Sequence, residues 1–190
     1  MAGSDPPHRR DELSSLFEAL HREAAELFTA PADEAFFRSP EEGVWSAAEN
    51  VVHLVKSVQA VAGALKVPKL VLTMRFGTAK ASRAYGEIHQ IYKDKLQQGA
   101  VATGPYVPQI PTPATPEEAQ RSRTRALAGW QRAGESLVRE LGKWSEAALD
   151  KHRLPHPLLG KLTVREMLFF THFHDLHHIA AVRRCLEPGG

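Results

Sequence analysis

Four of the chain's ten histidines lie within seven consecutive positions, from His172 to His178. Inside a helix, His174 and His178 are four residues apart, so they lie on one face, one turn apart. Neutral imidazole is the commonest nitrogen ligand for zinc, nickel, iron and similar divalent ions. The spacing therefore indicates half of a metal site, and a third ligand must come from elsewhere in the chain.

Helical geometry separates the other groups of this run from the pair. His172 lies about 200° round the helix from His174 and is expected to face away from the site. His177 lies about 60° from the pair, which makes it a group beside the site or at the surface and a weak catalytic candidate. Asp175 lies about 100° from His174, which argues against a bridge within its own helix.

The third candidate ligand is His53, which lies among the apolar residues of an earlier predicted helix. Ser46-Ala-Ala-Glu49 has the form of a capping box and predicts the start of that helix. Thr163-Val-Arg-Glu166 has the same form and predicts the start of the helix that carries the histidine pair. If the two helices face each other, the three imidazoles can converge and leave coordination positions open for water or substrate.

A structural role is the competing interpretation, because a histidine on an apolar helix face is more often a hydrogen-bonded core residue than a ligand. Burying two unpaired imidazoles together costs free energy unless something bridges them, which favours the metal. His156, held between two prolines, is a further weak catalytic candidate as a proton donor. The alternative for His156 is that it stabilises the turn before the last helix.

Four long amphipathic segments account for most of the chain. They are predicted to be helices from about Asp11 to Ala30, Ser46 to Leu65, Thr115 to Leu141 or Trp144, and Thr163 to Leu186. Residues 31–43 and the proline-rich residues 99–116 are predicted to be loops, and no convincing strand is found. A long crossover over residues 66–116, with an amphipathic pattern at 83–97, joins the second and third helices. The fold class predicted is an all-α four-helix bundle.

Size and composition predict one soluble domain over residues 1–190, with flexible termini at 1–10 and 187–190. The formal charge of +2 does not indicate nucleic acid, and no apolar run is long enough to span a bilayer. The N-terminus lacks the hydrophobic stretch of a signal peptide, and a single cysteine, Cys185, fits a reducing compartment. We therefore expect a cytoplasmic protein with a small-molecule substrate and with no nucleic-acid or membrane partner.

Three motifs resemble the DinB-like (YfiT-like) superfamily of metal-dependent enzymes: Trp45 to Leu54, His156 to Glu166, and His174 to His178. The resemblance spans roughly residues 8–187 in the order of the elements. It implies a four-helix bundle with a long connection, often a homodimer. It also implies a divalent metal held by one histidine of the second helix and two of the last, which are here His53, His174 and His178.

The resemblance leaves the reaction open. Some relatives use low-molecular-weight thiols as cosubstrates in transfer or isomerisation, and others are suspected hydrolases. The leading hypothesis is a metal-dependent enzyme that acts on a small molecule, as a thiol-dependent transferase or as a hydrolase. No carboxylate is obviously placed as a general base, which favours the thiol reaction. The alternatives are a non-catalytic dimer that binds a metal or a small molecule, and an interaction module with structural histidines.

Overall fold

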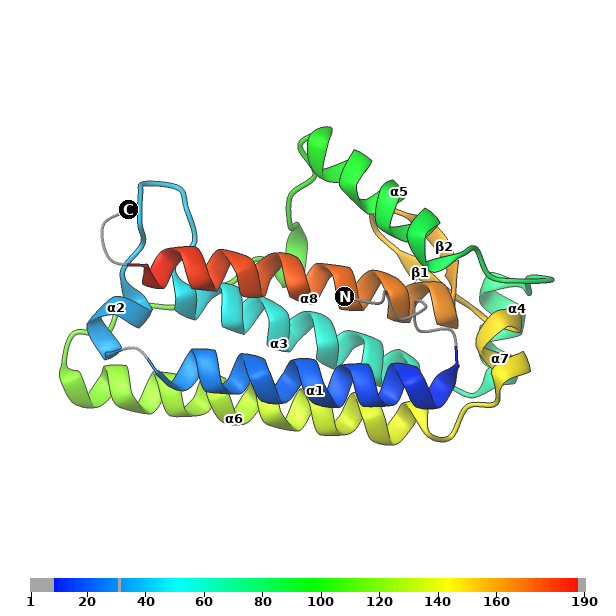
Figure 1. Cartoon of the computed structure of the whole chain (residues 1–190), viewed down its shortest axis with the longest axis horizontal. Helices are drawn as coiled ribbons and strands as arrows, with labels where there is room; N and C mark the ends of the chain where they lie inside the picture. The colour runs from blue at the N-terminus through cyan, green and yellow to red at the C-terminus, as the bar shows by residue number, and fades with distance from the viewer. Residues whose placement is uncertain (1–8, 31, 188–190) are drawn as a thin grey trace, which may run out of the picture.

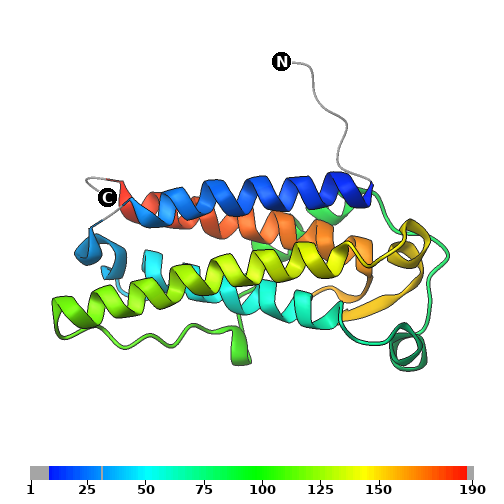
Figure 2. The same cartoon turned by 90° about the horizontal axis from the view of Figure 1, so that it is seen from below.

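Four long helices form the body of the molecule in this computed structural model, which describes residues 9–30 and 32–187. They are α1 (Arg10–Thr29), α3 (Ala47–Ala64), α6 (Pro116–Leu141) and α8 (Val164–Leu186). Helix α3 packs against α6 and α8, and α1 packs against the same two helices (Figures 1 and 2). The predicted four-helix bundle is confirmed.

The long connection lies between α3 and α6. Figure 1 shows that these two helices run in the same direction, so the chain must return along the bundle between them. The returning segment contains α4 (Lys69–Phe76), α5 (Tyr85–Gln97) and the 3-10 helix η1 (Gly104–Tyr106). Helix α5 packs against α8, and η1 contacts α3. The crossover therefore covers the two helices that carry the candidate histidines.

Two local predictions are wrong. The segment predicted as a loop before Ser46 contains the short helix α2 (Asp33–Phe37), because Phe36 is fully buried in the core. The prediction of no strand is also wrong: after α7 (Glu146–Lys151), the strands β1 (Arg153–His156) and β2 (Gly160–Thr163) pair as an antiparallel hairpin. Strands of four residues are too short to show alternation, and two prolines in and after β1 obscure them further.

Capping boxes start both helices of the site, as the sequence predicts. The Ser46 hydroxyl accepts a hydrogen bond from the Glu49 amide at 3.2 Å, and Glu49 accepts one from the Ser46 amide at 2.8 Å. Thr163 and Glu166 make the same pair of bonds at 3.1 and 2.9 Å. The Arg83 amide and guanidinium also donate to Glu166, so the crossover is tied to the start of α8. Burial opposes the charge of Glu166, but these bonds hold its pKa below the ordinary value.

The first helix begins within the segment predicted to be a flexible N-terminus. Residues 1–8 and 188–190 of the predicted flexible termini lie outside the described residues, while Arg10 is the first residue of α1 and its amide donates to Glu146 at 2.8 Å. Within the described ranges, no helix has the length and apolar character needed to cross a membrane.

Candidate metal centre

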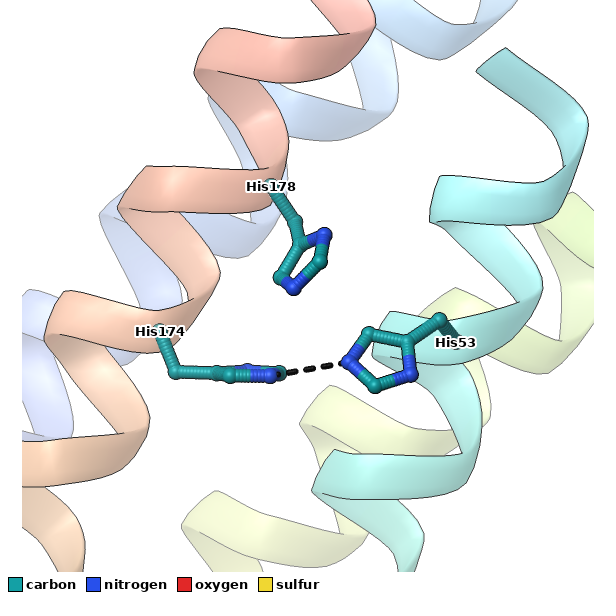
Figure 3. Close-up of side chains that lie close together, drawn as sticks. All are labelled: His53, His174 and His178. Carbon is teal, nitrogen blue, oxygen red and sulfur yellow. Dashed lines mark hydrogen bonds between the residues drawn. The ribbon is translucent and has the colours of Figure 1, made fainter. Parts of the chain in front are cut away.

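Helices α3 and α8 bring three histidines to one point of the bundle. His53 comes from α3, His174 and His178 come from successive turns of α8, and the three rings point toward one another (Figure 3). One ring nitrogen of each histidine lies within 4.8 Å of those of the other two. The Nε2 atoms of His53 and His174 are only 2.9 Å apart. The structure thus brings together the three histidines that the sequence singles out.

The outer nitrogens of two rings donate to oxygen acceptors. His53 Nδ1 lies 2.7 Å from the Tyr106 carbonyl, and His178 Nδ1 lies 2.8 Å from Asn50 Oδ1. The Asn50 amide nitrogen donates to the Ser46 carbonyl at 2.9 Å, which leaves the Asn50 oxygen facing the histidine. Because these oxygens only accept hydrogen bonds, both rings carry their proton on Nδ1. Each ring therefore presents an Nε2 lone pair to the centre of the cluster.

A carboxylate lies behind the third ring. Asp175 Oδ1 is 3.6 Å from His174 Nδ1, and Asp175 Oδ2 is 3.8 Å from Nε2 of His21 on α1. The Asp175 side chain is fully buried, and neither oxygen makes a hydrogen bond at these distances. Burial opposes ionisation of Asp175, but the two imidazoles outweigh it and hold the pKa of the carboxyl below its ordinary value. A carboxylate in this position favours a proton on His174 Nδ1 and a third inward lone pair on Nε2.

Three lone pairs in one buried cluster repel each other unless a positive charge lies between them. The surroundings oppose a proton in that place, because burial lowers the pKa of His53 to about 4 and lowers the pKa of His178 far below its ordinary value. A divalent cation accepts all three lone pairs at once. Two imidazoles bound to one ion at about 2.1 Å have nitrogens roughly 3 to 3.4 Å apart, and the His53 and His174 Nε2 atoms, at 2.9 Å, are close to that spacing. The donor set therefore fits a divalent transition metal.

A cavity of about 1010 Å³ opens beside the histidines. Its walls come from α3, α8, the tip of the β1–β2 hairpin, the loop before α3, and α5 with the segment that follows it. Its volume is at the upper end of the range of about 300–1,000 Å³ typical of small-molecule sites. The crossover thus supplies one wall of the candidate site, as well as the Tyr106 carbonyl that orients His53.

The remaining histidines of the sequence prediction divide into two groups. His156 and His177 both line the cavity, and His177 is exposed. His172 is buried away from the cluster, with its Nδ1 2.6 Å from the hydroxyl of Tyr85 on α5. The orientation expected for His172 from the helical wheel therefore agrees with its position.

Sequence reasoning misses three groups that contact the cluster. Asn50 precedes His53 by three residues on the same face of α3, so its spacing was a usable signal. The Tyr106 carbonyl had no signal, because a backbone group in an irregular crossover has no sequence signature. The wheel angle argued against a bridge from Asp175 within its own helix, yet Asp175 Oδ1 lies 3.6 Å from His174 Nδ1, because that angle describes the direction of Cβ and not the reach of the carboxylate.

Both the sequence and the fold resemble those of known proteins. The model of the DinB superfamily matches residues 11–182, and the chain belongs to this superfamily. The four-helix bundle protein TT2238 has 16% sequence identity and a TM-score of 0.55, and the match covers 92% of this chain and 98% of that one. The colibactin self-resistance protein ClbS, solved in complex with a dsDNA, has 14% sequence identity and a TM-score of 0.49. That match covers 97% of this chain and 99% of ClbS. The comparison with curated proteins gives no match.

These comparisons correct one prediction about partners. The small net charge led to the exclusion of nucleic acid, and that exclusion does not stand beside the structure of ClbS, which was solved in complex with a dsDNA. At this level of similarity the likeness shows the fold and assigns no partner to this chain. The predicted homodimer and cytoplasmic location are tested by neither comparison and stay predictions.

The buried imidazoles generate a prediction for the pH dependence of stability. His53 titrates near 4 in the folded protein and near 6.5 when unfolded, so the unfolded chain binds more protons between these values. The free energy of unfolding of chelator-treated protein should therefore be highest above pH 6.5, and His53 alone should account for about 3 kcal/mol of its fall toward pH 4. Denaturant titrations across this range measure it. The drop should shrink in His53→Asn, and a drop of equal size in that variant would show that other groups cause it.

Proposed function

We propose that His53, His174 and His178 hold a divalent transition metal, of the zinc, nickel or iron type, and that the chain is a metal-dependent enzyme acting on a small molecule. The observation that carries this proposal is the set of three inward Nε2 lone pairs, with two of the rings unable to turn away from their Nδ1 acceptors. When bound, such an ion supplies a Lewis acid that polarises a substrate oxygen and acidifies a bound thiol or water.

The chain's own residues have separate tasks in this proposal. Asn50 and the Tyr106 carbonyl set the tautomers of His178 and His53 and hold the rings in place. The negative charge of Asp175 lies near His174 Nδ1, where it stabilises a proton on that nitrogen and makes Nε2 a more basic ligand. The apolar side chains of the cavity exclude water, which strengthens every electrostatic interaction inside it.

A thiol-dependent transferase is favoured over a hydrolase. Glu41 is the one carboxylate that the described residues contribute to the cavity wall, and it is exposed at the loop before α3. Asp175 lies behind His174, so hydrolysis lacks a carboxylate positioned as a general base. A thiol reaction does not require that base, and a cavity of about 1010 Å³ can hold a small thiol and a second substrate together.

Metal content tests the site directly. Protein expressed with metal supplied and purified without chelator should contain about one transition metal per chain by elemental analysis. His53→Ala and His174→Ala should each remove it, because two imidazoles hold such an ion far less tightly than three. His89→Ala, which changes an exposed histidine of α5, is the matched control and should keep the metal. Wild-type protein that holds no metal after this treatment would contradict the proposal.

The role of Asp175 is measured by metal affinity. Asp175→Asn keeps the size of the side chain and removes its charge, so we expect zinc to bind roughly 10- to 100-fold more weakly in competition with a chromophoric chelator. Thermal unfolding of the metal-free variant controls for damage to the fold. Unchanged zinc affinity in a folded variant would show that Asp175 has only a structural role.

The thiol reaction is separated from mere binding by a matched pair of ligands. Calorimetry should show that 2-mercaptoethanol binds zinc-loaded protein but not chelator-treated protein, while ethylene glycol, its oxygen counterpart, binds neither. Equal binding of the two compounds would count against a thiol cosubstrate. Thiol binding without turnover in screens of thiol-dependent transfers would favour the alternative, a non-catalytic metal- and small-molecule-binding protein.

A further inference from the structure

We infer that His156 is a fixed, uncharged hydrogen-bond donor to an oxygen atom of the small molecule that occupies the cavity. The ligand class that this donor recognises is a mostly apolar compound with a carbonyl or carboxylate oxygen. The inference rests on the proposed function, because it takes the cavity to be the ligand site. It does not require the metal.

The backbone of the hairpin turn determines which nitrogen of His156 carries the proton. His156 is the last residue of β1, and three residues connect it to Gly160, which has a positive φ of 73° and starts β2. The backbone amides of Leu158 and Leu159 both donate to His156 Nδ1, at 3.2 and 3.1 Å. A nitrogen that accepts hydrogen bonds has no proton of its own, so the ring proton lies on Nε2.

Packing and burial fix the orientation of the His156 ring and keep it uncharged. It packs edge-on against Phe170 of α8, with 4.1 Å between the ring centroids. Burial lowers the pKa of His156 to about 4, so the imidazole is neutral at physiological pH and the two donated bonds are kept. Between the turn on one side and Phe170 on the other, His156 has one tautomer and one orientation.

The free Nε2–H belongs to a residue of the cavity wall. His156 lines the same cavity as His53, His174 and His178, and its Nε2 has no hydrogen-bond partner among residues 9–30 and 32–187. Tyr92 packs edge-on against the same Phe170, with 5.1 Å between the ring centroids, and lines the cavity as well.

A donor of this kind has a defined chemical use. It stabilises negative charge on a ligand oxygen without itself changing charge, because it was oriented during folding rather than during the reaction. The mostly apolar wall around it selects the rest of the molecule.

Two substitutions test separately the two roles of His156, which are the Nε2–H donor toward a ligand and the Nδ1 acceptor within the turn. His156→Asn keeps an acceptor near the position of Nδ1, as in an Asx turn, and removes the Nε2–H. His156→Gln keeps an amide N–H near the position of Nε2 and loses the acceptor for the turn. We expect His156→Asn to melt near the wild-type temperature and His156→Gln to melt lower, because Leu158 and Leu159 then lose their partner.

Ligand binding should change in the opposite order. With benzoate as the probe, calorimetry on zinc-loaded and on chelator-treated protein should show roughly tenfold weaker binding to His156→Asn and little change for His156→Gln. Toluene, which has no oxygen, should bind all three proteins alike when followed by NMR. Two-bond ¹H–¹⁵N spectra of labelled wild-type protein should show the His156 proton on Nε2.

The results that would contradict the His156 donor differ from those that would contradict the proposed metal centre. A proton on Nδ1 of His156, unchanged benzoate affinity in His156→Asn, or no benzoate binding to the wild type at millimolar concentration would each contradict the donor. If wild-type protein holds no metal after expression with metal supplied, while benzoate still binds it more tightly than it binds His156→Asn, the proposed metal centre is contradicted and the donor stays in place.

Discussion

The packing of α3 against α8 forces three imidazoles into ring contact inside a buried region, and this crowding is the constraint on which the rest of the site depends. A single buried histidine can satisfy both nitrogens with nearby polar groups. Here the inward nitrogens of His53 and His174 face each other at 2.9 Å, and burial makes protonation costly for His53 and His178. The cluster is therefore stable only with a positive charge at its centre or with a shared proton between two rings.

The surroundings of the cluster extend this constraint into the bundle. Asp175 lies between His174 and His21, and the His21 ring stacks on Trp130 of α6 with 4.0 Å between centroids. Gly134 of α6 leaves the space for that ring, because a Cβ at this position would overlap His21. One line of contacts thus runs from the candidate metal centre through a buried carboxylate to the opposite pair of helices. The charge at the site and the packing of α1 and α6 are coupled through Asp175.

The crossover and the hairpin add what the bundle alone lacks. Four helices position the imidazoles, but the Tyr106 carbonyl and the cavity walls come from segments outside the bundle. The same segments are anchored to the start of α8, through Arg83 on Glu166 and through β2, which ends at Thr163. The shape of the cavity and the position of the helix that carries two of the histidines are therefore set together.

The four long helices, the starts of two of them and the three candidate histidines could be predicted from the sequence, because these depend on local signals: helical spacing and the capping boxes at Ser46 and Thr163. That His53 meets His174 and His178 depended on the two helices facing each other, which only the tertiary structure decided. The sequence did not determine helix α2 or the β-hairpin, where burial of Phe36 and pairing between short strands act over distance. It also left the chemistry of the site incomplete. The Tyr106 carbonyl, the position of Asp175 and the tautomer of His156 are decided only by tertiary structure, because each depends on which donors and acceptors the folded chain brings within hydrogen-bond range.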